Sequence, residues 1–184
     1  MPACYEIRYA DGRVEETFGI RGLHYEFPDG ETLDVHTEIG WCFSCNTFTD
    51  IERLEAIEEI DQQIADMHDP DSVLYRMFFD SPAGKDGEFL KSQVAEAQRR
   101  RDFLLQRTSP AKCVHCGTEN VKQIPHGETV EHPAGCGTFV LESVGMCSTD
   151  FMNWYFTPEG ERIPRDTRPS YWYHPSLDRD RTNR

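Results

Sequence analysis

Apolar and polar side chains alternate near the start of the chain, most clearly over Tyr5-Glu6-Ile7-Arg8-Tyr9. This period of two is typical of a half-buried antiparallel strand. A turn sequence rich in Asp, Gly or Pro lies between the two strands of each of two candidate pairs. These residues favour tight turns, because proline presets φ and glycine tolerates positive φ. The pattern predicts β hairpins over residues 4–42: Cys4–Ala10 with Arg13–Phe18 around Asp11-Gly12, and Leu23–Phe27 with Thr32–Trp41 around Pro28-Asp29-Gly30.

The hydrophobic period changes to that of a helix after residue 48. Thr49 or Asp50 is a candidate N-cap, and Pro70 ends the segment. A shorter helix is predicted over Ser72–Phe79, and a second long helix from about Gly87 to Arg107. Stripes at spacings of three and four, apolar except for Arg101, mark the two long helices: Ile57, Ile60, Ile64 and Met67 in the first, and Leu90, Val94, Ala97, Arg101 and Leu104 in the second.

The first long helix is acidic and the second carries three consecutive arginines at 99–101. Two such helices can pair antiparallel with opposite charges beside the seam, or each can pack separately on the sheet. Strands and tight turns return after Pro110. The predicted later strands are Thr138–Met146, Met152–Phe156 and Glu161–Ile163. The whole pattern predicts an α+β fold with one domain over residues 1–163 and a helical insertion over 49–108. A polar tail over 164–184, rich in arginine and aromatic residues, follows this domain.

Composition and charge narrow the classes of function. The 184 residues include 33 acidic and 19 basic side chains, for a net charge of −14, and residues 1–80 alone carry a net −14. Such a surface opposes nucleic-acid phosphates; it suits a protein partner with a basic surface, or it only keeps the protein soluble. No run of 18 apolar residues and no apolar leader are present. We therefore expect a cytoplasmic protein with no membrane contact.

Two C-x-x-C pairs are the strongest chemical signal: Cys42 with Cys45, and Cys113 with Cys116. Zinc prefers a tetrahedron of four ligands, and two such turns supply four thiolates. The 67 residues between the pairs exceed the usual spacing. An outgoing helix of about 18 residues rises about 27 Å and a returning one of about 21 residues about 31 Å, so a helical hairpin can bring the pairs together.

This arrangement resembles the zinc-ribbon (zinc β-ribbon) superfamily. The resemblance depends on the four cysteines and their turns, and it covers about a third of the chain, around residues 36–45 and 110–163. It implies that Cys42, Cys45, Cys113 and Cys116 bind a structural Zn²⁺, and it implies no particular activity, because the superfamily includes transcription factors, ribosomal proteins, enzyme subunits and interaction modules.

Further possible ligands lie downstream at His132, Cys136 and Cys147, and His126 or His115 could complete a set of four. Three assignments remain open. Cys136 and Cys147 are buried thiols, or they form a second metal site with histidine, or they replace Cys42 and Cys45 around the first metal. Cys4, on a predicted strand, is expected to pack in the core.

Three functions are compatible with these features. The sequence favours a non-catalytic interaction or regulatory module with an acidic surface. The first alternative is an enzyme. Trp41-Cys42-Phe43-Ser44-Cys45 is similar to a thioredoxin redox motif. A catalytic metal at the second, histidine-containing site could instead use Glu128 or Glu131 as a base. The second alternative is a nucleic-acid-associated zinc ribbon using Tyr171-Trp172-Tyr173 and the tail arginines, although the sequence favours docking of these aromatic residues on the protein body or on a protein partner.

Overall fold

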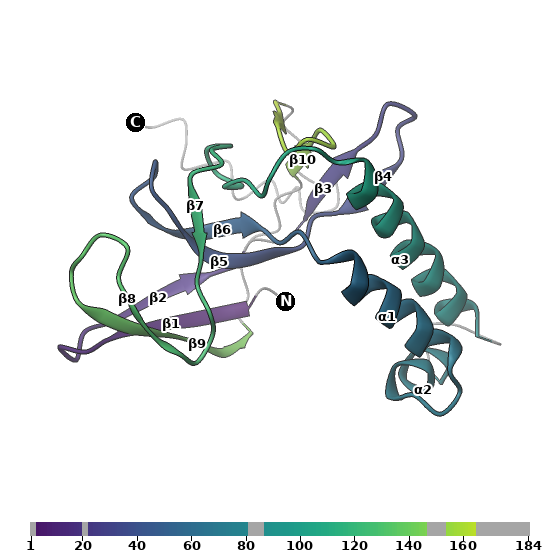
Figure 1. Cartoon of the computed structure of the whole chain (residues 1–184), viewed down its shortest axis with the longest axis horizontal. Helices are drawn as coiled ribbons and strands as arrows, with labels where there is room; N and C mark the ends of the chain where they lie inside the picture. The colour runs from purple at the N-terminus through teal and green to yellow at the C-terminus, as the bar shows by residue number, and fades with distance from the viewer. Residues whose placement is uncertain (1–2, 20–21, 81–86, 147–153, 165–184) are drawn as a thin grey trace, which may run out of the picture.

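A computed structural model describes residues 3–19, 22–80, 87–146 and 154–164, and it shows an α+β fold (Figure 1). The strands form three small sheets, and the helices form a separate unit that projects from one end of them. The predicted fold class is therefore confirmed. The predicted tail lies almost wholly outside the described residues.

The first sheet is antiparallel throughout and has the strand order β2-β1-β9-β8. The predicted hairpin at the start of the chain is confirmed, with Gly12 at a φ of 87° in its turn. The strands of this sheet are β1 (Ala3–Tyr9), β2 (Val14–Phe18), β8 (Thr129–Glu131) and β9 (Thr138–Met146).

The second sheet has the order β6-β5-β7 and contains both a correction and the candidate site. Its strands are β5 (Thr37–Cys42), β6 (Thr47–Glu52) and β7 (Val121–Gln123). The prediction that a helix begins at Thr49 or Asp50 is wrong, because β6 occupies these positions and pairs with β5 from Cys42↔Thr47 to Thr37↔Glu52. Its β-branched residues Thr47, Thr49 and Ile51 favour a strand.

The third sheet joins distant parts of the chain in the order β11-β10-β3-β4. Strand β3 pairs antiparallel with β4 and parallel with β10. The predicted strand Thr32–Trp41 is thus divided between two sheets. The strands are β3 (Leu23–Glu26), β4 (Thr32–Asp34), β10 (Trp154–Phe156) and β11 (Arg162–Ile163).

The helical unit comprises α1 (Ile57–His68), α2 (Val73–Phe79) and α3 (Glu88–Gln106). The antiparallel pairing of the two long helices is confirmed, since α1 leaves the sheets and α3 returns beside it (Figure 1). Opposite charges meet across this pair, where Arg101 Nε lies 2.5 Å from Asp61 Oδ1. The buried face of α3 differs from the predicted stripe in part: it contains Arg100 and Phe103 besides Leu90.

Two hydrophobic clusters hold these layers together. One lies between the first and second sheets and includes Ile7, Trp41 and Phe139. The other joins the third sheet to α3 and to Val114, which lies between the second pair of cysteines. Each helix in the described ranges falls short of the length or the apolar character that a bilayer crossing requires.

Candidate metal centre

The first pair of cysteines lies in the turn between β5 and β6. Cys42 is the last residue of β5, and its backbone pairs with Thr47 at the start of β6. The backbone N–H of Cys45 donates a hydrogen bond to Cys42 Sγ over 3.3 Å. Asn46 has a φ of 53° and is the one non-glycine residue with positive φ among the described residues. Asparagine adopts the left-handed conformation more readily than most residues other than glycine, so the turn can close directly after Cys45.

The second pair repeats this local geometry. The backbone N–H of Cys113 donates to Thr118 O over 2.8 Å, and that of Gly117 donates to Cys113 O over 2.8 Å. Gly117 has a φ of 74°, as its place directly after Cys116 predicts. Each pair is therefore held by a tight turn with a left-handed residue after its second cysteine. Asn46 was not singled out from the sequence, although its place after Cys45 matches that of Gly117.

Backbone pairing on both sides brings the two turns together. Before the second turn, Cys113 forms a β bridge with Ile51 of β6. After it, β7 runs antiparallel to β5, with Val121 opposite Cys42. The N–H of Phe43 also donates to Asn120 O over 3.1 Å. The segment that carries Cys113 and Cys116 is thus attached to both strands of the hairpin that carries Cys42 and Cys45.

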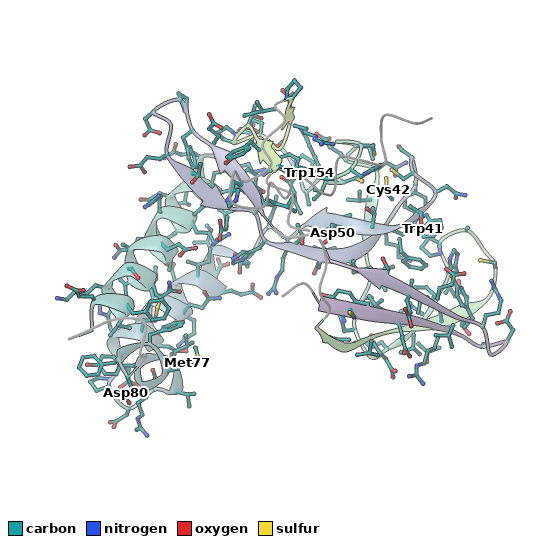
Figure 2. All side chains as sticks on the ribbon, turned by 180° about the vertical axis from the view of Figure 1, so that it is seen from behind. Trp41, Cys42, Asp50, Met77, Asp80 and Trp154 are labelled. Atoms are coloured by element: carbon teal, nitrogen blue, oxygen red, sulfur yellow. The ribbon has the colours of Figure 1, made fainter. Side chains whose placement is uncertain are left out.

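The four sulfur atoms consequently lie close together, as the predicted helical hairpin between the two pairs requires. All four Sγ atoms lie within 4.8 Å of one another, and Cys42 Sγ is 3.6 Å from Cys116 Sγ. Tetrahedral bonds of about 2.3 Å to zinc place the sulfurs about 3.8 Å apart, so the set fits one ion. Cys42 and Cys113 are buried, Cys45 is partly exposed and Cys116 is exposed. In Figure 2, Cys42 lies at the opposite side of the molecule from the helices.

Burial and mutual proximity oppose ionisation of two of the four thiols, those of Cys113 and Cys45. Burial raises the pKa of Cys113 to about 11, against the opposing effect of hydrogen bonds from the N–H groups of Cys116 and His115, and the neighbouring thiols raise it further. The pKa of Cys45 is raised by burial and by its hydrogen bonds with Cys116 and Cys42. At Cys116, burial is outweighed by the Thr118 N–H and the other thiols, and the pKa is lowered. A divalent cation would let all four thiols ionise, because it supplies the missing positive charge.

The redox alternative for Cys42 and Cys45 lacks its structural requirement. A thioredoxin-type thiolate is stabilised at the N-terminus of a helix that directly follows the motif. Here β6 follows Cys45, and α1 begins at Ile57. Both thiols are free, as are those of Cys113 and Cys116.

The second group of candidate ligands is not brought together among the described residues. His132 is buried among the rings of Trp41, Phe48 and Phe139. Its Nδ1 accepts a hydrogen bond from Ala134 N over 3.1 Å. Cys136 is exposed and free. Apart from the four-cysteine cluster, the described part of the chain holds no group of three or more His, Cys, Asp or Glu side chains whose ligand atoms lie close enough together to bind one ion. Cys147 lies outside the described residues, so its role as a ligand stays a prediction.

The other histidines and Cys4 have different surroundings. His126 contacts the ring of Tyr5, at 5.3 Å between centroids, and His115 lies 6.5 Å from Trp154. Cys4, which was expected to pack in the core, lies in β1 as predicted; it is half-buried and disulfide-bonded.

A buried ion pair beside the site was missed from the sequence. Arg107 Nη2 lies 2.6 Å from Glu52 Oε2, and the two side chains are 1% and 3% exposed. Tyr25 donates its hydroxyl to Glu52 Oε1 over 2.8 Å, and Lys112 N donates to Glu52 Oε2 over 2.9 Å. Glu52 in β6 thereby holds the end of α3 and the residue that precedes Cys113. The available signal was an arginine at the C-terminus of the second helix, where basic side chains are common.

No protein-family model matches the chain, and neither a curated protein nor a solved structure is significantly similar to it. A functional conclusion about the protein therefore depends on the meeting of four cysteine sulfurs from two turns that are far apart in the sequence.

Proposed function

We propose that Cys42, Cys45, Cys113 and Cys116 bind one structural Zn²⁺ in a zinc ribbon with a helical insertion. The observation that carries this proposal is the cluster of four Sγ atoms within 4.8 Å. Four thiolates fill the tetrahedral shell of zinc and leave no position for a substrate or a water molecule, which is typical of a structural site. The ion would join the β5–β6 hairpin to the segment that follows α3.

We further propose that the protein acts as an interaction or regulatory module whose acidic surface faces a basic protein partner. Net charge supports this role: the chain carries −14 overall, all of it accounted for by residues 1–80. Complementary charge directs encounters with a partner and opposes nucleic acids, whose phosphates carry the same sign. The alternative of nucleic-acid binding through the tail stays a prediction, since residues 165–184 lie outside the described ranges.

Metal analysis of the purified protein tests the zinc proposal. We expect one zinc per chain, and replacement by Co²⁺ should give the absorption bands of tetrahedral thiolate coordination. The variant Cys113→Ser should lose the metal and most of the stability that it confers. Cys136→Ser is the matched control, because Cys136 is free and outside the cluster, and this variant should keep both. Full metal content in the Cys113→Ser protein would contradict the proposed ligand set.

A further inference from the structure

A hollow of about 200 Å³ lies between the turn that joins β3 to β4 and the C-terminal half of α3. Two aromatic rings form its apolar part: Phe103 is buried in the hydrophobic cluster of the third sheet, and the partly buried Phe27 packs against that cluster. Their ring centroids are 5.9 Å apart in an edge-to-face arrangement. Figure 1 shows the β3–β4 hairpin beside this end of α3. We call this hollow the hairpin pocket; its lining includes Phe27, Asp29 and Glu31 of the hairpin and Arg99, Asp102 and Phe103 of α3.

Three carboxylates belong to the lining of the hairpin pocket. Asp29 and Glu31 come from the turn, and Asp102 comes from α3. The turn fixes Asp29, because its Oδ1 accepts a hydrogen bond from the N–H of Glu31 over 2.9 Å. The Asp102 carboxylate forms no hydrogen bond or ion pair with another side chain in the described part of the chain. All three residues are exposed, so their charges face whatever enters the pocket.

The one basic side chain in this lining is already engaged. Arg99 Nη1 lies 3.4 Å from Glu31 Oε2 and donates a hydrogen bond to Thr32 O over 3.3 Å. Arg99 therefore offsets the charge of Glu31, and those of Asp29 and Asp102 remain uncompensated. Three carboxylates and one guanidinium give the lining a net charge of −2. The pocket thus combines aromatic rings with an excess of negative charge, which suits a cation.

The size of the pocket favours a side chain of a larger partner over a free small molecule. Pockets that enclose small ligands usually have volumes of about 300–1,000 Å³, and the hairpin pocket is smaller, at about 200 Å³. Among cationic side chains, arginine fits this lining best. Its planar guanidinium stacks on aromatic rings and forms paired hydrogen bonds with carboxylates, whereas the lysine ammonium acts as a compact point charge.

We propose that the hairpin pocket binds an arginine side chain in a basic segment of a protein partner, with the guanidinium against the ring of Phe27 and paired with the carboxylates of Asp29 and Asp102. This inference rests on the proposed function as an acidic interaction module, and it names the surface and the chemistry of the partner. An anionic partner, such as a nucleic acid, would meet charge of its own sign at this pocket.

Binding of a fluorescein-labelled peptide to the full-length, metal-loaded protein tests the proposal. The probe contains three arginines separated by Gly-Ser. One control peptide has citrulline, which is neutral and of nearly the same shape, in place of arginine, and the other has lysine. Fluorescence anisotropy should show binding of the arginine peptide, binding of the lysine peptide weaker by about threefold, and none of the citrulline peptide. High salt should weaken the binding, because the carboxylates are exposed.

A charge-matched pair of variants locates the binding site. D29N/D102N should weaken binding of the arginine peptide about tenfold, equivalent to about 1.4 kcal/mol. Asparagine at position 29 keeps the oxygen that accepts the Glu31 N–H, so the turn is retained. E58Q/E59Q removes the same number of charges from exposed positions in the first turn of α1, outside the pocket. This control should change the affinity by less than about twofold, since salt screens distant charges.

The variant Phe27→Leu tests the aromatic part of the pocket. Leucine keeps an apolar side chain against the hydrophobic cluster but removes the ring. Binding of the arginine peptide should weaken by about threefold, and the preference for arginine over lysine should disappear. A purely structural role of Phe27 would weaken both peptides equally and leave that preference in place. Thermal unfolding and zinc content, measured on every variant, show that the fold and the metal site are retained.

The outcomes separate this proposal from the broader one. Equal weakening in D29N/D102N and E58Q/E59Q would overturn the pocket while leaving a general acidic docking surface in place. Binding of the citrulline peptide would overturn it as well. A wild-type protein that bound neither the arginine nor the lysine peptide at low salt would contradict both proposals.

The chain's own basic tail is the competing occupant. The full-length variant in which Arg165, Arg168, Arg179 and Arg181 are changed to Gln removes that competitor. Its affinity for the arginine peptide should equal that of the wild type. Markedly tighter binding in this variant would mean that the tail occupies the pocket, and the proposal of a partner's arginine would fail.

Discussion

At the scale of single residues, Gly40 shows how closely the second sheet is packed. It lies in β5 between β6 and β7, opposite Thr49 and Gln123. A Cβ atom at this position would collide with the side chain of Ile51 and come within 2.8 Å of Lys122 O. Backbone cannot give way as a side-chain end can, so β7 must shift. Because β7 directly follows the second cysteine turn, the strain would reach the metal centre.

We therefore predict that Gly40→Ala lowers the free energy of unfolding by about 1–3 kcal/mol, the usual cost of overpacking. Urea unfolding followed by circular dichroism measures this change, and a Zn²⁺ titration of the variant should show weaker binding. Gly12→Ala is a useful comparison, since a Cβ at Gly12 meets no atom within 4 Å and the cost there comes from its φ of 87° alone. Full zinc affinity in Gly40→Ala would show that β7 does not position Cys113 and Cys116.

His132 is a second residue whose surroundings have a measurable consequence. Burial lowers the pKa of this histidine below its ordinary value of 6.5, and the Glu15 carboxylate opposes the shift less strongly. At a pH below about 6.5, His132 therefore takes up a proton more readily in the unfolded chain than in the folded one. Protonation of His132 therefore destabilises the fold as the pH decreases from about 6.5.

We expect His132→Phe to be less sensitive to acid than the wild type between pH 7 and pH 5, because the proton-linked contribution is removed. The variant loses the hydrogen bond from Ala134 N, so its stability at pH 7 can be lower while its pH dependence is flatter. Unfolding curves across this range give both quantities. The cysteines are common to both proteins, so the difference between the two pH profiles reports on His132. Parallel profiles would argue against the lowered pKa.

At the scale of secondary-structure elements, the ion pair between Glu52 and Arg107 joins the helical unit to the sheets. It connects β6 with the residue that follows α3, and Tyr25 brings β3 into the same network. The pair of Arg101 and Asp61 has a similar separation, 2.5 Å, but the side chains are 36% and 49% exposed. Breaking a buried pair leaves an uncompensated charge, whereas an exposed pair is screened by solvent.

The two ion pairs should therefore respond differently to the same substitution. We predict that Arg107→Leu costs about 3–5 kcal/mol of stability, or prevents folding, because Glu52 is left charged and buried. Arg101→Leu should cost at most about 1 kcal/mol. Thermal unfolding of both variants tests the contrast, and Glu52→Gln with Arg107→Leu should recover part of the loss. Similar stability of the two single variants would contradict the structural role of the buried pair.

At the scale of the whole molecule, the proposed zinc joins two segments that the helical unit separates in sequence. Its binding free energy then contributes directly to folding, because the unfolded chain has no formed site. The first and second sheets also share a hydrophobic cluster, so part of the fold should remain when the metal is removed. The region around Cys42 and Cys113 should be affected most.

We predict that removal of the metal with a chelator lowers the melting temperature, and that added Zn²⁺ restores it, with a stabilisation that rises with the logarithm of the free Zn²⁺ concentration above the Kd. Hydrogen exchange should become faster in β7 and in the backbone near Cys113, while β1 and β9 keep their protection. Magnesium, which prefers oxygen ligands, is the control ion and should not restore stability. A melting temperature insensitive to the chelator would contradict a structural metal.

Much of this organisation could be predicted from short stretches of sequence. The hairpin around Asp11-Gly12 and the helix capped by Ser72 depend on residues within a few positions of one another. The segment over 47–52 could not be assigned in this way, because Thr49 and Asp50 suit a helix cap as well as a strand. Its pairing with β5 and with Cys113 makes this segment a strand. Neither partner is part of the segment itself, and Cys113 is distant in the sequence.

The sequence by itself indicated the two cysteine turns, because each C-x-x-C motif is specified within a few consecutive positions; only the structure showed that the sulfurs of both turns lie together. It also indicated that two long helices and a short one separate the turns, since the periodicity of a helix is local. Only the tertiary structure decided that β6 precedes the helices, that Glu52 and Arg107 are paired in the interior, and that His132 lies among aromatic rings. These features depend on burial and on pairing between distant segments, whose free energies arise only once the whole chain has folded.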